Sequence, residues 1–406
     1  MHQQNLKILM VAPQPFFSAR GTPFSVLHRI RALTNKGHSV DLVTYPIGDD
    51  IEMQGLEIMR SRRVPFVTNI KVGPSISKIF LDLSLFFETR KALKKNTYDV
   101  IHSHEEAAFF CARLAKKYSL VHIYDMHSSL PQQLANFKNF NFRLFKSYFE
   151  YLENYVLETC DGVITICDDL AEIATQKFRN QPHMMIENFG DDRKVFKPVV
   201  EDVEADLELK NKFILLYSGT FEIYQGLDIL LEAMVEIKSN IPEVVLILVG
   251  GTIDQIHQYK KMASELHVDQ FVRFLGSIHP SRIPNILDIA DVIVSPRSRG
   301  TNTPLKIYGY LRTGTPIVAT DLYTHRQILN ENIAVLVPPT ASGIASGIDR
   351  LKSDKKYALR ISKQASQFAI ENFPDKKYID MVSELYDEVL SNSRNRPDAV
   401  TSKHLQ

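Results

Sequence analysis

The stretch 295–320, S-P-R-S-R-G-T-N-T-P-L-K-I-Y-G-Y-L-R-T-G-T-P-I-V-A-T, decides the fold of this chain. Two short apolar runs, 290–294 and 316–319, flank its loop and are typical of buried strands in a parallel sheet. Between them, Pro304 has the φ favoured in the first turn of a helix, and Gly314 stands where a helix ends. The stretch therefore predicts a strand, a loop, a short helix and a second strand.

The loop of this stretch has the composition of a phosphate site. Asn302 and Thr303 offer backbone N–H groups just before the helix, and Arg297, Arg299 and Lys306 add positive charge. The alternative is a solvated turn whose hydroxyls cap the helix. The loop alone does not separate these two interpretations.

Length and composition bound the class of protein. A chain of 406 residues favours two or more domains, and 44% hydrophobic with 23% charged residues is ordinary for a globular protein. A net charge of +1 gives no reason to expect a nucleic-acid partner. The three cysteines lack metal-like spacing, and no signal peptide or apolar run of about 20 residues is present. We therefore expect a cytoplasmic protein with structural thiols.

Apolar strands alternate with helical patterns along the rest of the chain. The predicted strands are 6–12, 39–44, 64–67, 100–102, 120–124 and 162–166, and then 213–218, 244–249, 272–275, 292–294, 317–319 and 334–337. The interruption at 180–206, with prolines and an acidic run, is interpreted as an interdomain linker. The fold class is therefore α/β, with two Rossmann-like, doubly wound domains facing each other across a cleft. Ligands of such folds bind beyond the carboxyl ends of the strands.

The order of these segments resembles the GT-B glycosyltransferases, specifically the retaining family-4 type. Each matching motif is weak alone, whereas their order and spacing over nearly the whole chain are specific. The motifs are Lys7-Ile8-Leu9-Met10-Val11, Gly37-His38-Ser39-Val40, Asp99-Val100-Ile101-His102-Ser103-His104, Asn188-Phe189-Gly190-Asp191, Tyr217-Ser218-Gly219-Thr220, Gly226-Leu227-Asp228, Leu248-Val249-Gly250-Gly251, Phe274-Leu275-Gly276, Ala290-Asp291 and Gly314-Thr315-Pro316-Ile317-Val318-Ala319.

The resemblance implies roles for the two domains. Residues 1–190 become an acceptor-side domain, to which 376–391 cross back, and residues 191–375 become the nucleotide-sugar domain. Residues 392–406 are polar, and we expect a disordered tail there.

The resemblance also implies particular site residues. His127 falls near the transferred sugar, and Arg299 and Lys306 are expected to stabilise the leaving diphosphate. The expected donor-binding residues are Gly21, Thr22, Gly219, Thr220, Glu222, Gly276, Ser277, Ile278, Thr301, Asn302 and Thr303. For His127 the alternative is a polar residue satisfied at a strand end, and for Glu222 it is an acid in a surface turn.

Several family residues are missing. The family's E-x7-E glutamates fall at Thr301 and Gly309, and its diphosphate-binding Arg and Lys fall at Thr220 and Gln225. Our hypothesis is that the positive charges of the 295–320 stretch compensate for the missing Arg and Lys.

Two further patterns bear on metals and membranes. His102 and His104, followed by Glu105 and Glu106, resemble a metal cluster, but no third spaced ligand follows and we expect no metal. The segment 60–95 is aromatic with a basic end, which suits either peripheral contact with an anionic membrane or a core helix with a solvated end. The aromatic segment 137–155 leaves the same alternatives open.

The resemblance predicts a glycosyltransferase that moves a hexose-type sugar from a nucleotide-diphosphate-sugar to a glycan or lipid-linked acceptor, with retention, in envelope polysaccharide or glycolipid synthesis. No cofactor, metal or nucleic acid is expected, and location is cytoplasmic, with inner-membrane contact as an option. The alternatives are a degenerate GT-B protein that binds glycan or a partner without catalysis, and a nucleotide-sugar epimerase or hydrolase.

Overall fold

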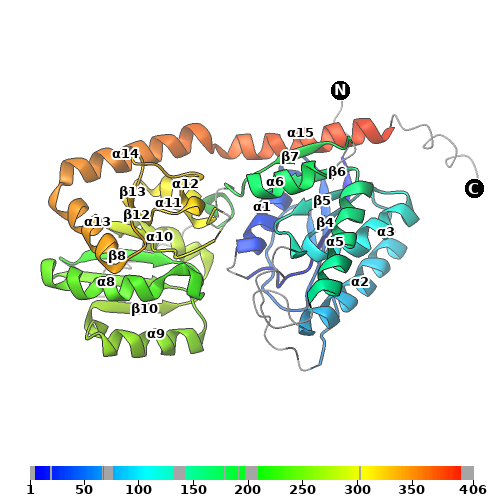
Figure 1. Ribbon diagram of the computed structural model, residues 1–406. Helices are drawn as coiled ribbons and strands as arrows, with labels where there is room; N and C mark the ends of the chain where they lie inside the picture. Colours follow the sequence, from blue (N-terminus) through cyan, green and yellow to red (C-terminus); the bar gives the residue numbers. More distant parts are fainter. Residues whose placement is uncertain are drawn as a thin grey trace, which may run out of the picture. The chain divides into compact units, whose positions relative to one another are not determined.

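The computed structural model describes residues 5–18, 21–65, 67, 76–131, 142–177, 180–190, 192–196, 209–300 and 303–394 (Figure 1). The chain divides into two compact units. The first comprises Met1–Asn188 and Lys376–Gln406, and the second comprises Phe189–Asp375. The first boundary lies two residues before the one that we placed after residue 190.

The first unit is built on a seven-stranded parallel sheet of order β3-β2-β1-β4-β5-β6-β7. Its strands are β1 Lys7–Ala12, β2 Ser39–Thr44, β3 Leu56–Arg60, β4 Val100–His104, β5 Val121–Met126, β6 Gly162–Thr165 and β7 His183–Met185. Its helices are α1 Gly21–Asn35, α2 Ile76–Lys95, η1 Glu105–Ala107, α3 Ala108–Tyr118, α5 Phe142–Thr159, α6 Asp168–Thr175 and α15 Asp375–Arg394. The central strands β1 and β4 are buried on both faces; β1 is accordingly apolar from Ile8 to Ala12, whereas β4 ends in the buried polar residues His102, Ser103 and His104.

The second unit contains a six-stranded parallel sheet of order β10-β9-β8-β11-β12-β13. Its strands are β8 Phe213–Ser218, β9 Val244–Val249, β10 Val272–Gly276, β11 Val292–Ser295, β12 Ile317–Thr320 and β13 Val335–Val337. Its helices are η2 Asp192–Lys194, η3 Ile223–Gln225, α8 Leu227–Asn240, α9 Ile253–Glu265, η4 Asp269–Phe271, η5 Pro280–Arg282, α10 Ile283–Asp288, α11 Lys306–Thr313, α12 Tyr323–Arg326, α13 Ala341–Ser353 and α14 Lys355–Asn372. Helix α8 packs against α13, and α11 packs against α14.

Both sheets place their first strand third in the order, next to the fourth, which is the Rossmann arrangement. The strand order therefore reverses between β1 and β4 in the first unit and between β8 and β11 in the second. Ligands of doubly wound sheets bind at the carboxyl end of such a switch point. The predicted α/β class with two doubly wound sheets is confirmed.

The structure corrects several predicted boundaries. The described residues of the predicted strand 64–67, which are 64, 65 and 67, form no strand: Pro65 lacks an N–H, and the amide of Val67 donates to the carbonyl of Val64 over 3.3 Å in a turn. The third strand is instead β3, an edge strand that mixes polar and apolar residues and is half-buried or exposed throughout. The predicted linker at 180–206 contains β7, which completes the first sheet.

Two helix ends also differ from the prediction. Helix α11 begins at Lys306 with Leu305 as its N-cap, later than Pro304, and it ends as predicted at Gly314, whose φ of 73° lies in the left-handed region. Helix α15 continues to Arg394, so residues 392–394 are helical and not part of a disordered tail, because a basic side chain suits the last turn of a helix. Residues 395–406 lie outside the described residues.

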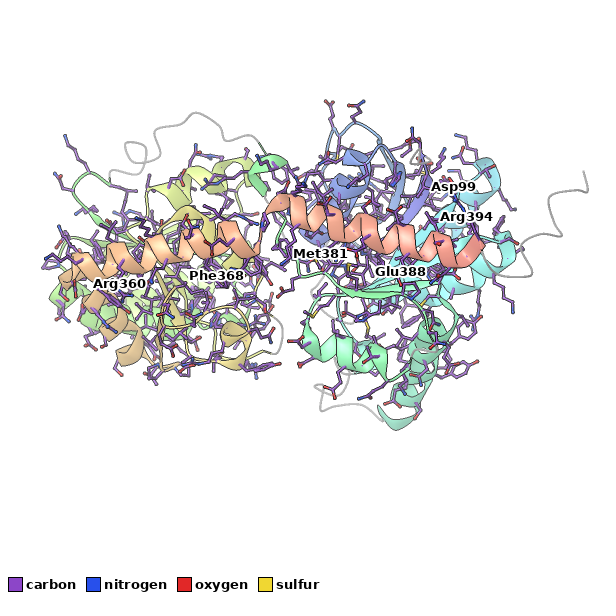
Figure 2. The ribbon with its side chains drawn as sticks, turned by 90° about the horizontal axis from the view of Figure 1, so that it is seen from above. Asp99, Arg360, Phe368, Met381, Glu388 and Arg394 are labelled. Carbon is purple, nitrogen blue, oxygen red and sulfur yellow. The ribbon has the colours of Figure 1, made fainter. Side chains whose placement is uncertain are left out.

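Helix α15 follows the second unit in sequence but belongs to the first. Figure 2 shows it lying along the surface of the first unit, with Met381 and Glu388 labelled. Its inner face carries Tyr378 and Tyr386, which are almost completely buried. Their hydroxyls enter the interior of the first unit, where they find polar partners.

Candidate functional site

Lys306 is a half-buried lysine at the switch point of the second sheet. Its ammonium donates to the side-chain carbonyl of Gln225 over 3.2 Å and lies 3.8 Å from the centroid of the Tyr217 ring. Burial, with the Arg297 guanidinium nearby, holds its pKa well below the usual range. Among the residues that the structure describes, no carboxylate forms an ion pair with Lys306. An anionic ligand would therefore favour its protonated form.

Arg297 adds a second positive charge from the loop after β11. Its guanidinium lies 5.2 Å from the centroid of the Tyr224 ring and donates to the Thr324 hydroxyl over 3.2 Å. The backbone below it is tightly held because Gly226, with φ of 72°, approaches Pro296 so closely that a Cβ would lie 2.0 Å from the proline carbonyl oxygen. The tips of β8 and β11 are thereby fixed against each other.

His325, which sequence reasoning missed, connects the tips of β11 and β12. Its Nδ1 lies 2.7 Å from the carbonyl oxygen of Thr320, and its Nε2 lies 2.9 Å from the Ser295 hydroxyl. Nδ1 therefore carries the proton, and Nε2 accepts from Ser295. Burial lowers the pKa of His325 to about 4. The Thr320 hydroxyl donates to the carbonyl of Arg297 over 2.6 Å, so this network supports the Arg297 loop.

The residues predicted around Lys306 differ in how close the structure places them to its ammonium. Gly219 lies beside it, since a Cβ there would be 3.3 Å from the ammonium. Thr303 donates its hydroxyl to Gln327 over 2.7 Å, and the Thr220 carbonyl accepts from the Tyr217 hydroxyl over 2.6 Å. The side chain of Arg299, by contrast, is exposed, and its backbone carbonyl accepts from the Arg297 guanidinium over 2.9 Å. Thr301 and Asn302 lie outside the described residues.

The other predicted donor residues of this unit follow the carboxyl ends of β8 and β10. Glu222 precedes η3 and accepts from the side-chain amide of Gln255, at the start of α9, over 3.2 Å. Gly276 ends β10 with φ of 69°, and its carbonyl accepts from the amide of Gly250 over 2.7 Å. The next two residues are Ser277, which is exposed, and Ile278, which is half-buried.

The first unit contains a buried ion pair at the carboxyl end of its sheet. The Arg29 guanidinium donates to the Asp125 carboxylate over 2.8 Å, and both side chains are 0% exposed. Arg29 also donates to the Tyr378 hydroxyl over 2.6 Å and to the carbonyl of Ile186 over 3.0 Å. Although burial opposes ionisation, Arg29 and the surrounding imidazoles hold the pKa of Asp125 well below its usual range.

Three histidines surround this carboxylate. His127 places its Nε2 3.3 Å from Asp125 and 3.0 Å from Nδ1 of His104. His102 places its Nε2 3.4 Å from the same carboxylate, and its Nδ1 lies 2.7 Å from the Tyr386 hydroxyl. Burial lowers the pKa of His127 to about 4, so its imidazole is neutral at neutral pH. It can therefore exchange hydrogen bonds with a hydroxyl but does not act as a cation.

His102, His104 and Asp125 also have the geometry of a chelating group, since one ligand atom from each lies within 4.8 Å of the others. Sequence reasoning considered the two histidines with Glu105 and Glu106, whereas the convergent acid is Asp125. The Arg29 guanidinium, however, already occupies the carboxylate and supplies positive charge there. We therefore interpret this group as a buried ion pair between Arg29 and Asp125, flanked by the neutral imidazoles of His102 and His104, and not as a metal site.

Gly21 and Thr22 form the first turn of α1, which follows β1. Gly21 is exposed, and its carbonyl accepts from the Ser25 hydroxyl over 3.5 Å. The structure thus starts the helix two residues before Pro23, where the sequence suggested it.

The comparisons with known proteins agree with this architecture. A model described as Glycosyltransferase Family 4 matches residues 19–192, and one described as Glycosyl transferases group 1 matches residues 200–368. Together they span most of both units. The fold and the matched models place the chain among transferases that have two domains, each built on a Rossmann-like sheet. The chain is a member of the GT-B glycosyltransferases.

Two curated relatives match most of the chain. A phosphatidyl-myo-inositol mannosyltransferase of Mycolicibacterium smegmatis is 23% identical, covering 89% of this chain and 90% of that protein. The UDP-Gal:alpha-D-GlcNAc-diphosphoundecaprenol alpha-1,3-galactosyltransferase of Escherichia coli is 24% identical, covering 95% and 98%.

Two solved structures share the fold. Sucrose-phosphate synthase from Thermosynechococcus elongatus has a TM-score of 0.78 at 20% identity, covering 96% of this chain and 100% of that one. HepE from Anabaena, in complex with UDP and glucose, has a TM-score of 0.73 at 17% identity, covering 94% and 100%. In the described part of this chain, no helix combines the length and apolar character needed to cross a membrane.

Proposed function

We propose that the chain transfers a hexose-type sugar, with retention of anomeric configuration, from a nucleotide-diphosphate-sugar whose diphosphate binds beside Lys306. The observation that best supports this proposal is the half-buried ammonium of Lys306, which has no carboxylate partner among the described residues and lies at the switch point. A diphosphate would restore its full charge. The Arg297 guanidinium would also stabilise the negative charge that develops on the diphosphate oxygens as the bond to the sugar breaks.

The proposed position of the charge explains how the family's missing Arg and Lys are replaced. The lysine expected at position 225 is a glutamine here, and the ammonium of Lys306 lies against that glutamine's side chain. A positive charge is thus available at nearly the same place from a different element. Of the two missing glutamates, one falls at Thr301, outside the described residues, and the other falls at Gly309.

The reaction that we propose forms the bond between the sugar's anomeric carbon and an acceptor oxygen while the bond to the β-phosphate oxygen breaks. The acceptor hydroxyl attacks from the face that the diphosphate leaves, and its proton passes to the departing phosphate. His127, neutral and oriented by Asp125 and His104, is proposed to hydrogen-bond a hydroxyl of the transferred sugar. Because lysine and arginine neutralise the leaving group, we propose that no metal is required, so activity should survive a chelator.

The acceptor is proposed to be lipid-linked, in cell-envelope polysaccharide or glycolipid synthesis on the cytoplasmic side of the membrane. The support comes from the relatives, whose names specify a phosphatidyl-myo-inositol and a diphosphoundecaprenol-linked sugar. A lipid-linked acceptor also requires peripheral contact with the membrane.

A calorimetric screen of UDP, GDP, ADP and TDP, followed by their sugars, tests this proposal. We expect one nucleoside diphosphate to bind and raise the melting temperature. With that donor and a lipid-linked acceptor, proton NMR of the product reports the anomeric configuration. Inversion would contradict retention, donor binding without turnover would favour the non-catalytic alternative, and conversion of the donor sugar without transfer would favour the epimerase. No binding by any diphosphate would defeat the proposal.

A further inference from the structure

Helix α2 of the first unit has two apolar faces. Its inner face carries Leu81, Leu85 and Ala92, which are 0%, 0% and 3% exposed. These residues belong to the core under the sheet. The core therefore does not need the other face of the helix, and the interpretation of α2 as an ordinary core helix leaves that face unexplained.

The opposite face, here called the outward stripe, consists of four large apolar residues. Ile79, Phe80, Leu83 and Phe87 are 66%, 55%, 53% and 57% exposed. Phe80, Leu83 and Phe87 follow each other at intervals of three and four residues, which places them on one side of a helix. Isolated exposed apolar residues are common, but a continuous stripe of this kind marks an interaction surface.

The stripe continues into positive charge along the same side of the helix. Lys91 and Lys94 follow Phe87 at intervals of four and three residues, and both are exposed. An open hollow of about 450 Å³ is lined by Phe87, Arg90, Lys91, Lys94 and Lys95. Glu88, the acidic residue of α2 nearest to this basic end, forms an ion pair with Lys91 over 2.7 Å.

We infer that the outward stripe and the basic end of α2 dock on an anionic lipid bilayer. Phenylalanine and leucine would enter the boundary of the acyl chains, while the basic residues would meet the phosphate headgroups. A second copy of the chain fits less well, because α2 offers no free carboxylate on this side to meet the basic end of a partner helix. The inference deepens the proposed function and rests on it for the lipid-linked acceptor.

Two exposed tyrosines lie on α5, which is joined to α2 through α3. Helix α3 contacts α2 through Phe110 and Phe86, whose ring centroids are 5.5 Å apart, and contacts α5 through Phe109 and Phe149. On α5, Tyr148 and Tyr151 are 56% and 60% exposed. Tyrosine suits the headgroup level of a bilayer because its ring is apolar and its hydroxyl is polar.

Vesicle flotation of the full chain tests the inference. We expect retention on phosphatidylcholine vesicles that contain phosphatidylglycerol, weaker retention on phosphatidylcholine alone, and loss of the difference at high salt. The variant Phe80→Ser/Leu83→Ser/Phe87→Ser should bind at least about tenfold more weakly. The variant Lys94→Glu/Lys95→Glu should lose the preference for anionic vesicles. Since the substituted side chains are exposed, the melting temperatures of both variants should match that of the wild type.

The matched control is Leu359→Ser/Ile370→Ser on α14 of the second unit, where both side chains are as exposed as the stripe. It should bind vesicles like the wild type. Wild-type protein that stays in solution with anionic vesicles, or a control that loses binding equally, would overturn the inference. A dimer that dissociates only in the triple variant, without vesicle binding, would assign the stripe to a second copy instead. Donor binding in the absence of vesicles tests the proposed function separately.

Discussion

Replacing Asp125 by asparagine should destabilise the first unit severely. The substitution keeps the shape of the side chain but leaves the Arg29 guanidinium, 0% exposed and 2.8 Å away, without its counter-charge. Breaking one partner of a fully buried pair costs about 3–5 kcal/mol, against a total stability of about 5–15 kcal/mol. For a unit of this size, that loss corresponds to a fall of about 6–20 °C in melting temperature.

Differential scanning calorimetry measures this effect with an internal reference, because the second unit's transition should not move. The matched control is Asp380→Asn, which breaks the ion pair between Lys36, the residue after α1, and Asp380 on α15, whose side chains are 28% and 49% exposed. This exposed pair should contribute about 0–1 kcal/mol. The double variant Arg29→Met/Asp125→Leu should cost less than Asp125→Asn alone, since no charge remains buried. An Asp125→Asn protein as stable as the Asp380→Asn protein would refute the reasoning.

Three further predictions concern other parts of the molecule. His127 has a pKa of about 4 in the folded protein and an ordinary pKa of 6.5 in the unfolded chain, so the unfolded state binds its proton first as pH falls. The free energy of unfolding should therefore decrease by up to about 3 kcal/mol between these two pH values. His127→Gln should show a shallower pH dependence of the urea midpoint. Lys306→Met should weaken diphosphate binding by about 10–100-fold, and calorimetry in buffers of different ionisation enthalpy should detect proton uptake only in the wild type. Gly226→Ala should destabilise by more than about 1 kcal/mol because its Cβ meets the carbonyl of Pro296, whereas Gly309→Ala, with nothing within 4 Å of its Cβ, should stabilise α11 by about 0.5–1 kcal/mol in thermal unfolding.

Much of the fold follows from local sequence pattern. Strands β1, β8 and β9 are buried on both faces, and their sequences are therefore nearly continuous apolar runs that predict strands. Gly314 marks the end of α11 because its left-handed conformation favours glycine. The edge strands β3 and β7 escaped prediction because β3 mixes polar and apolar residues without a regular period and β7 has only three residues.

The candidate sites were less accessible to prediction because their contacts join distant segments. Lys306 was found through its position in the loop-helix pattern, but its contact with Gln225, 81 residues away, has no local signature. Arg29 was missed because it lies in a helix of otherwise core-like residues, and its partner Tyr378 is 349 residues further along. His325 likewise lies in a four-residue helix whose sequence gives no indication of the network it completes.

The return of α15 to the first unit has a consequence for the order in which the protein is completed. Residues 1–188 leave the ribosome first, yet Arg29 and His102 lack their hydroxyl partners until Tyr378 and Tyr386 have been synthesised. The second unit is continuous in sequence and needs no later segment. The half that is made first is therefore the half that is finished last, and a chain truncated before α15 should leave a polar interior exposed to chaperones and proteases.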